Sequence, residues 1–358
     1  MTAVGLLAAS TRVSLSGHWH GLFLLRGKEG MRLELKDDLF LGDGPRLLWG
    51  VSFARVRRLV AGRGASEAGA ARLDFEFDEA EGSGIIRNLL GDGTEVVTLF
   101  GRYEDSEGRT PRGLFVGGAL PDIAADDAQA NESGMAYRDA RGWHHVWCNV
   151  NEGVYDTVHG VMVYPSAWRF VGSRVLVRER ERLVLGSTHE VELSGTTIRM
   201  ERFAYFRAGQ PWFKLGVHVV NAGDQVARFA YLYGDEPWVG DFGSSAGNVG
   251  WTARGIVERE GFLEGGEDRF AGVYDVDSRT ANFLAWLGDE KPLAVFFSNR
   301  PGPPKTRDAP LSSNEIFLGV EWKVSSLPPG GSWSVLLAIG LAEVDPAAGP
   351  RLPRAFEP

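Results

Sequence analysis

The sequence contains a single cysteine, Cys148, among its 358 residues. One cysteine cannot form an internal disulfide, so a small scaffold held together by disulfides is excluded. Cys148 lies between Trp147 and Asn149, and we expect it to be a small buried apolar residue. No apolar run approaches the roughly 18 residues that a membrane-spanning helix needs, so no transmembrane segment is predicted.

An excess of positive charge is also lacking, because 38 Lys and Arg stand against 47 Asp and Glu, a net charge of −9. Nucleic-acid binding needs a positive surface, so this balance argues against that partner and fits a neutral or cationic one. The P-loop, the nucleophile elbow, the His-Glu-x-x-His motif and the Cys-x-x-Cys motif are all absent from the sequence. These absences disfavour P-loop nucleotide chemistry, α/β-hydrolase chemistry and zinc-finger binding.

The first ten residues contain a short apolar piece, Val4 to Ala9, without a basic stretch before it. This is not a complete secretory signal peptide, although it has the composition of a trimmed one. Two compartments therefore stay open: the cytoplasm, or the periplasm or exterior with the signal peptide trimmed.

Helical periodicity is scarce, and alternation of apolar and polar residues dominates instead. The alternation is clearest in residues 31–35, 73–77, 213–219 and 229–233, and it is typical of strands with one face on a core. The best helix candidate is the short segment Ser52–Ala61. Further strands are expected at Arg12–Ser16, Glu95–Phe100, Val175–Arg178, Arg182–Leu185, Glu190–Leu193, Thr197–Phe203, Asn282–Trp286, Leu293–Phe297, Ile316–Val320 and Trp333–Leu341.

Turn signals separate these short strands, and 47 glycines suit many tight turns. No internal repeat of 20–50 residues is evident, which disfavours a propeller or a solenoid. The pattern predicts an all-β fold, a large antiparallel β-sandwich with few short helices. Because clean linkers are missing, residues 1–358 are expected to form a single domain, with the loop 118–134 as the best candidate for a lobe boundary.

Residues 202–251 form the densest aromatic and polar stretch. They read as a strand, the turn Asn221–Asp224, a second strand, and an exit through Asp235, Glu236, Pro237 and Trp238. Proline lacks an N–H group and ends the hydrogen-bond ladder, so these side chains are expected at a strand end.

This order resembles that of galactose mutarotase-like supersandwich proteins. In that family a strand ends in an Asn-x-(Thr/Gly)-Asp turn, and the next strand leads to a His-Pro-Tyr-Phe type motif in the sugar cleft; Asn221, Asp224 and Glu236-Pro237-Trp238 stand in the same order here. The resemblance covers residues 221–251 and implies a supersandwich fold and a sugar ligand. The family's histidine falls on Asp235 or Glu236, which argues against ordinary mutarotase activity, because that mechanism uses a His acid and a Glu base.

Asp235, Glu236 and Asp241 admit two interpretations. Clustered carboxylates serve as acid and base in glycoside chemistry, or hold a hard cation such as calcium. They also cap turns in loops without any further function. The neighbouring Trp238 and Trp251 favour a sugar site, because aromatic faces pack against the C–H faces of sugars.

An acid–base pair needs a second carboxylate on the opposite wall. Glu315 and Glu321, which precede and follow the strand Ile316–Val320, are the best candidates. A separation of roughly 5–5.5 Å between carboxyl groups suits a retaining glycosidase, and roughly 6.5–9.5 Å an inverting one.

A second cluster lies in residues 143–152, where His145 and Trp147 share one face of a predicted strand. Sugar contact, a metal site and ordinary packing are the three interpretations, with packing the commonest. His218 lies on the strand face opposite Phe213 and Leu215 and is a further candidate for lining a cleft. No metal site is predicted, because no spacing typical of metal ligands stands out.

The sequence therefore predicts a carbohydrate-related protein that binds or acts on a glycoside or a sugar polymer. If it is an enzyme, a glycoside hydrolase, a lyase or an epimerase is expected, without a cofactor other than calcium. The alternatives are a non-catalytic structural or interaction protein of a bacterial surface or periplasm, and an isomerase of a small molecule.

Overall fold

The computed structural model describes residues 21–27 and 30–36, and residues 71–356 except 104–108, 121–132, 242–247, 264–267, 301, 305–307, 313–315 and 355. The chain divides into two compact units, Met1–Ala65 with Glu357–Pro358, and Ser66–Phe356. The first contains the antiparallel hairpin of β1 (Gly21–Gly27) and β2 (Gly30–Lys36), which confirms the strand predicted at 31–35. The predicted strand Arg12–Ser16 and helix Ser52–Ala61 lie outside the described residues.

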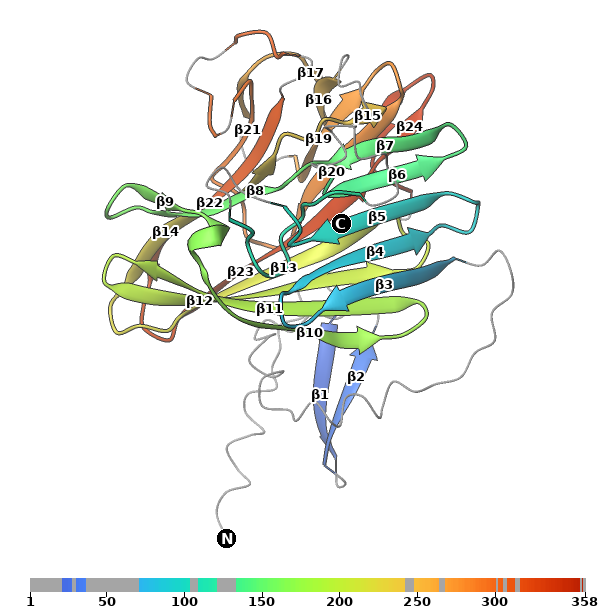
Figure 1. Ribbon diagram of the computed structural model, residues 1–358. Coiled ribbons are helices and arrows are strands. Elements are labelled where there is room, and N and C mark those ends of the chain that lie inside the picture. Colours follow the sequence, from blue (N-terminus) through green and yellow to red (C-terminus); the bar gives the residue numbers. More distant parts are fainter. Residues whose placement is uncertain are drawn as a thin grey trace. The chain divides into compact units, whose positions relative to one another are not determined.

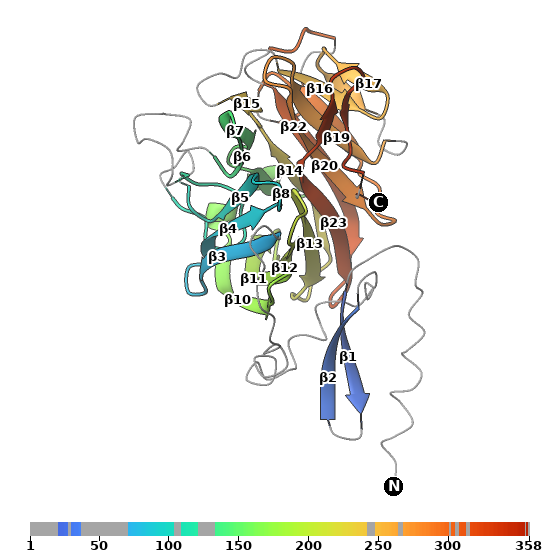
Figure 2. The ribbon, with the colours of Figure 1, turned by 90° about the vertical axis from the view of Figure 1, so that its right-hand side faces the viewer.

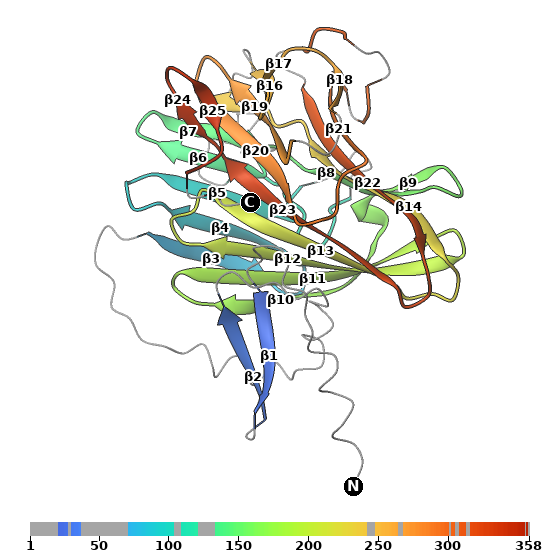
Figure 3. The same cartoon turned by 180° about the vertical axis from the view of Figure 1, so that it is seen from behind.

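The second unit is built on a nine-stranded sheet (Figure 1). From edge to edge its strands are β10 (Arg169–Arg178), β11 (Arg182–Leu193), β12 (Thr196–Arg207), β13 (Trp212–Asn221), β23 (Ser332–Leu341), β20 (Thr280–Leu287), β19 (Phe270–Asp275), β16 (Asn248–Thr252) and β17 (Gly255–Val257). Figure 3 shows β13, β23 and β20 running side by side at its centre.

Two six-stranded sheets accompany it in the second unit. One contains β18 (Gly261–Leu263), β21 (Ala294–Ser298), β22 (Phe317–Leu327), β14 (Ala227–Asp235), β8 (Asn151–Asp156) and β9 (Val161–Val163). The other contains β15 (Gly240–Asp241), β7 (Gly142–Trp147), β6 (Met135–Asp139), β5 (Glu95–Phe100), β4 (Ser83–Leu89) and β3 (Arg72–Asp78). Figure 2 separates β3–β7 from β13 and β23. A small hairpin of β24 (Glu343–Asp345) and β25 (Gly349–Arg351) completes the unit.

The predicted all-β class is confirmed. Every pairing between named strands is antiparallel, and the described residues contain no α-helix, only the 3-10 turn Pro165–Ala167. The predicted lobe boundary, residues 118–134, lies within the second unit, and most of that loop falls outside the described residues.

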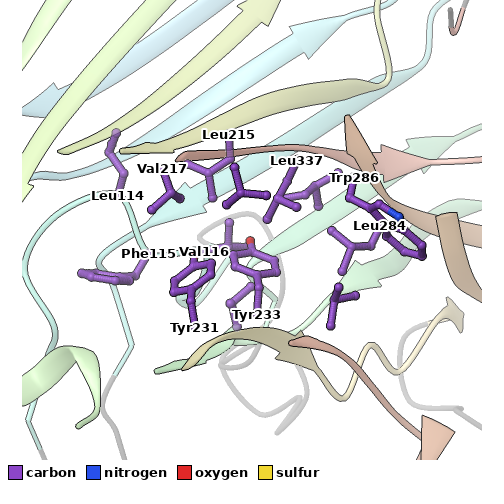
Figure 4. Packing of buried hydrophobic residues seen from close by; sticks show 14 of the residues in the cluster. Leu114, Phe115, Val116, Leu215, Val217, Tyr231, Tyr233, Leu284, Trp286 and Leu337 are labelled. Atoms are coloured by element: carbon purple, nitrogen blue, oxygen red, sulfur yellow. The ribbon is translucent and has the colours of Figure 1, made fainter. Parts of the chain in front are cut away.

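One apolar core joins the sheets, because alternate residues of their strands point inward. Phe100, Phe213 and Tyr231 come from the three different sheets and belong to the same buried cluster. Figure 4 shows the segment Leu114–Val116 in this core, between side chains of β13 and of β14. The interior of the sandwich is therefore filled in part by a connecting segment rather than by strands alone.

Candidate functional site

The segment that leaves β14 has an unusual backbone. Trp238 has a φ of +44°, in the left-handed region that bulky residues rarely adopt. Contacts from two sides hold the segment: the Cys148 thiol donates to the Pro237 carbonyl at 3.5 Å, and the Asn248 amide donates to the Val239 carbonyl at 3.0 Å. A strained residue held by its surroundings is typical of functional sites.

The Trp238 side chain is fixed beside a carboxylate. Its indole Nε1–H donates to Glu236 Oε1 at 2.7 Å, and both side chains are half-buried. An aromatic ring and a carboxylate, both reachable from solvent, therefore stand together at this strand end, as the sequence predicted. The ring can pack on apolar faces of a ligand, and the carboxylate can accept hydrogen bonds from hydroxyl groups.

Asp241 contacts His144, which the sequence did not indicate as a site residue. The two-residue strand β15 pairs with β7 so that Asp241 lies opposite His144. His144 Nδ1 lies 2.6 Å from Asp241 Oδ1, and its Nε2 lies 2.9 Å from Asp139 Oδ1. The imidazole is buried, whereas 58% of the Asp241 side chain is exposed. Both ring nitrogens lie within hydrogen-bond distance of a carboxylate, so the imidazole is clamped between Asp241 and Asp139.

The environment of the clamp favours the charged form of Asp139. Burial by itself would raise the pKa of Asp139, but hydrogen bonds from His144 and Arg141 lower it to about 2. The Tyr137 ring stacks on the His144 ring, with their centroids 5.8 Å apart. A surface carboxylate, Asp241, is thereby joined to a buried group that can carry a proton.

Gly240 lets the chain pass close to another carboxyl group. It has a φ of +128°, and a Cβ at this position would lie 2.1 Å from Asp275 Oδ2. Burial raises the pKa of Asp275 above its ordinary value, despite hydrogen bonds from Ser278 and Asp277 that lower it. No sequence signal distinguished Asp275 from an ordinary turn residue, because its neighbour Gly240 is remote in sequence.

Glu321, one of the two carboxylates predicted to pair with Glu236, does not lie opposite it in the sheet. Leu232 lies opposite Glu321 in the β14–β22 ladder, so Glu236, four residues further on, is displaced from Glu321 by about 13 Å along the strand. Burial raises the pKa of Glu321, and Lys323 opposes that shift. This register does not favour Glu236 and Glu321 as an acid–base pair. Glu315 and the side chain of Asp235 lie outside the described residues.

The two predicted tryptophan contacts on the sheets are buried. Trp147 has no exposed surface, and Trp251 is 2% exposed. The Trp251 indole donates to the Asn282 carbonyl at 2.9 Å. Contact of Trp147 and Trp251 with a ligand stays a prediction, and the burial of their side chains does not support it.

The two predicted histidines are buried as well. His145 lies 3.4 Å from the Ser133 hydroxyl, and burial lowers its pKa to about 3. His218 Nδ1 lies 2.6 Å from the Ser334 hydroxyl, across the β13–β23 pairing. Within the part of the chain that the structure describes, no three His, Cys, Asp or Glu side chains form a group that could hold a metal ion. Nor do the described residues include a helix long and apolar enough to cross a membrane.

No protein-family model and no curated protein matches this sequence. Solved structures that are similar to the chain include a galactose mutarotase-like protein from Clostridium acetobutylicum, with 9% identity, a TM-score of 0.42, and coverage of 76% of this chain and 98% of that one. A Klebsiella pneumoniae protein assigned as an aldose 1-epimerase has 11% identity, a TM-score of 0.44, and coverage of 75% and 83%. A 4-alpha-glucanotransferase from Thermococcus litoralis has 9% identity, a TM-score of 0.37, and coverage of 76% and 40%. Galactose mutarotase-like proteins are also the family that residues 221–251 resemble.

Proposed function

We propose that this protein binds carbohydrate at the strand-end site formed by Glu236, Trp238 and Asp241. The observation that carries the proposal is the conformation of Trp238, a large residue in the left-handed region whose indole is tied to Glu236 at 2.7 Å. Holding a tryptophan there costs free energy, on the order of 1–2 kcal/mol for the backbone. A glycine at this position would avoid that cost. We therefore infer that the contribution of Trp238 is its aromatic ring.

The chemistry of the site suits a sugar. One face of a pyranose carries C–H groups that pack on an aromatic ring, and its hydroxyl groups donate to carboxylates. Glu236 is half-buried beside the ring, and Asp241 is exposed and oriented by His144. The negative net charge of the chain fits a neutral or cationic sugar better than an acidic one.

Binding is favoured over hydrolysis. Glycoside hydrolysis needs two carboxyl groups no more than about 9.5 Å apart. Glu321 pairs with Leu232, four residues before Glu236, so the backbones of Glu236 and Glu321 are offset by about 13 Å along the strand direction, which does not favour them as an acid–base pair. Glu315 remains the candidate second carboxylate if the protein also cleaves its ligand.

The direct test is a glycan array probed with the full chain, followed by calorimetric titration of the glycans that bind. We expect Trp238→Ala to weaken binding at least about tenfold, the equivalent of 1.4 kcal/mol, and Trp238→Phe to retain part of the affinity. Phe262→Ala is the control, because Phe262 is an exposed aromatic residue of β18, outside this site. If no glycan binds, or if Trp238→Ala binds as tightly as the wild type, the proposal is wrong.

A further inference from the structure

A row of polar side chains crosses four neighbouring strands of the nine-stranded sheet. The members of the row are paired one after another across β11, β12, β13 and β23: Thr188, Glu201, His218 and Ser334. Side chains directly opposite each other share one face of a sheet, with their Cβ atoms about 4.5–5.5 Å apart. The row lies on the face turned away from the core, because Val217, which precedes His218, belongs to the core cluster. A carboxylate, an imidazole and a hydroxyl therefore stand side by side outside the strand-end site.

The imidazole and the hydroxyl of this row are in contact. His218 Nδ1 lies 2.6 Å from the Ser334 hydroxyl oxygen. A histidine that accepts the proton of a serine turns a weak nucleophile into an effective one. His218 is 4% exposed, whereas Ser334 is half-buried. The base is thus shielded from solvent while part of the serine is exposed.

Glu201 lies on the other side of the imidazole. The strand order β12–β13–β23 places His218 between Glu201 and Ser334. Because Nδ1 faces the serine, a carboxylate on the opposite side favours the tautomer that carries its proton on Nε2. In that tautomer Nδ1 is the acceptor that a general base needs. Arg199 Nε lies 3.5 Å from Glu201 Oε1, so the charge of the buried carboxylate is balanced locally.

An apolar strip runs beside the polar row. Two residues further along their strands, on the same face, Phe203, Gly216 and Leu336 are paired in register. A Cβ at Gly216 would meet nothing closer than 3.9 Å, so the glycine leaves room for a small apolar group between its two neighbours. This position is about 7 Å from the polar row along the strand direction. A short acyl chain can therefore pack there while its carbonyl group lies near the serine.

We infer that Ser334 and His218 hydrolyse carboxylic esters of short apolar acids, with Glu201 as a positioning residue. Ser334 Oγ forms a bond to the carbonyl carbon, and its proton passes to His218 Nδ1. The C–O bond to the alcohol then breaks, and the alcohol leaves with that proton. Water hydrolyses the acyl-serine by the same route, which releases the acid and restores the Ser334 hydroxyl. This activity is independent of carbohydrate binding.

A fluorophosphonate probe, which reacts covalently with activated serines, tests the inference on the full chain. We expect mass spectrometry to locate the label on Ser334, and we expect p-nitrophenyl butyrate to be hydrolysed faster than in buffer alone. Ser334→Ala should abolish both signals. Ser332→Ala is the matched control and should retain them, because Ser332 is an exposed serine on the same face of β23.

Two further variants separate catalysis from packing. His218→Gln should slow labelling at least about 100-fold, the lower end of what general-base catalysis contributes. Glu201→Gln should slow it less and should move the midpoint of the pH–rate profile to lower pH, because a nearby carboxylate favours the protonated imidazole. A purely structural role for Glu201 would leave that midpoint where it is.

The inference is wrong if Ser334 stays unlabelled while a serine hydrolase in the same tube is labelled. Equal labelling rates for His218→Gln and the wild type would also overturn it. Circular dichroism establishes that the variants are folded. If His218→Gln does not fold, the wild-type pH profile decides, because a labelling rate that does not rise through the titration of an imidazole, near about pH 6.5, excludes His218 as the base.

Discussion

The guanidinium of Arg202 and the carboxylate of Glu152 form an ion pair with no exposed surface on either side chain. Arg202 comes from the nine-stranded sheet and Glu152 from a six-stranded one, so the pair links two sheets of the second unit. The Tyr231 hydroxyl donates to Glu152 at 2.6 Å, and Arg202 donates to the Leu114 carbonyl at 2.9 Å. The Phe115 ring lies 4.4 Å from the guanidinium. The segment that fills the core is thus anchored by this pair.

Removing one partner of this pair should be costly. Glu152→Gln or Arg202→Met leaves an unpaired charge in the core, which typically costs about 3–5 kcal/mol of unfolding free energy. The double variant should be less destabilised than the two single variants together, because it leaves no isolated charge. Urea unfolding measures all three.

The control for the buried pair is Arg72→Ala. Arg72 and Asp74 form an ion pair in which about half of each side chain is exposed, so its loss should cost less than about 1 kcal/mol. A cost equally small for Glu152→Gln would show that the core relaxes to admit water around Arg202.

The positive φ of Trp238 predicts that glycine is more stable than alanine at this position, which reverses the usual order of the two residues. Glycine is normally less stable than alanine in a folded chain, but at a φ of +44° alanine bears the left-handed penalty and glycine does not. Trp238→Gly should therefore be more stable than Trp238→Ala by about 1 kcal/mol. Both lose the ring and should lose ligand binding equally. If the alanine variant is the more stable one in thermal or urea unfolding, the strained conformation is not maintained in solution.

The strands were predictable because their signal is local. Alternation of apolar and polar residues is a property of a few consecutive residues, and the burial of β3 alternates with it, whereas much of β14 is buried on both faces. The turn Asn221–Asp224 was also predictable. The short strands β9 and β18 were not, because three residues carry no period and depend on their neighbours for pairing.

The site was predictable only where its residues are consecutive. Glu236 and Trp238 lie two residues apart, and their association with a strand end follows from Pro237. His144 and Asp241 are 97 positions apart and meet only because β15 pairs with β7. Residue propensities and sequence spacing do not indicate that β15 pairs with β7. For that reason the sequence pointed to His145 as a site residue rather than to its neighbour His144.

Stability should fall as the pH falls below neutrality, because two histidines are buried in the neutral form. Burial lowers the pKa of His189 to about 3, with its Nε2 2.7 Å from the Arg112 carbonyl, and lowers the pKa of His145 to about 3. The unfolded chain binds a proton at each near pH 6.5, whereas the folded chain does not until about pH 3. The stability is therefore fully present above pH 6.5 and is lost as the pH drops toward 3, by about 1.4 kcal/mol per pH unit for each histidine.

Urea unfolding at pH 7 and pH 5 measures this dependence. His189→Gln should reduce the pH dependence by about half, because glutamine can still donate to the Arg112 carbonyl and does not titrate, whereas His145 still does. His159→Gln is the control, because 66% of the His159 side chain is exposed. An unchanged slope in His189→Gln would mean that His189 is solvated in the native state.

The clamp between His144 and its two carboxylates should decide whether the strand-end site stays assembled. His144→Phe fills a similar volume but removes the hydrogen bonds to Asp241 at 2.6 Å and to Asp139 at 2.9 Å. Hydrogen bonds to charged groups contribute about 1.5–3 kcal/mol each, so the variant should lose at least that much stability. Because β15 pairs only with β7 among the described strands, its release should loosen the C-terminal end of the segment that carries Trp238. Acrylamide quenching of tryptophan fluorescence should then increase, and glycan affinity should fall with it. Asp241→Asn, which keeps an acceptor oxygen toward His144, should show a smaller increase in quenching. If the increase matches that of His144→Phe, charge rather than the hydrogen bond holds the strand in place.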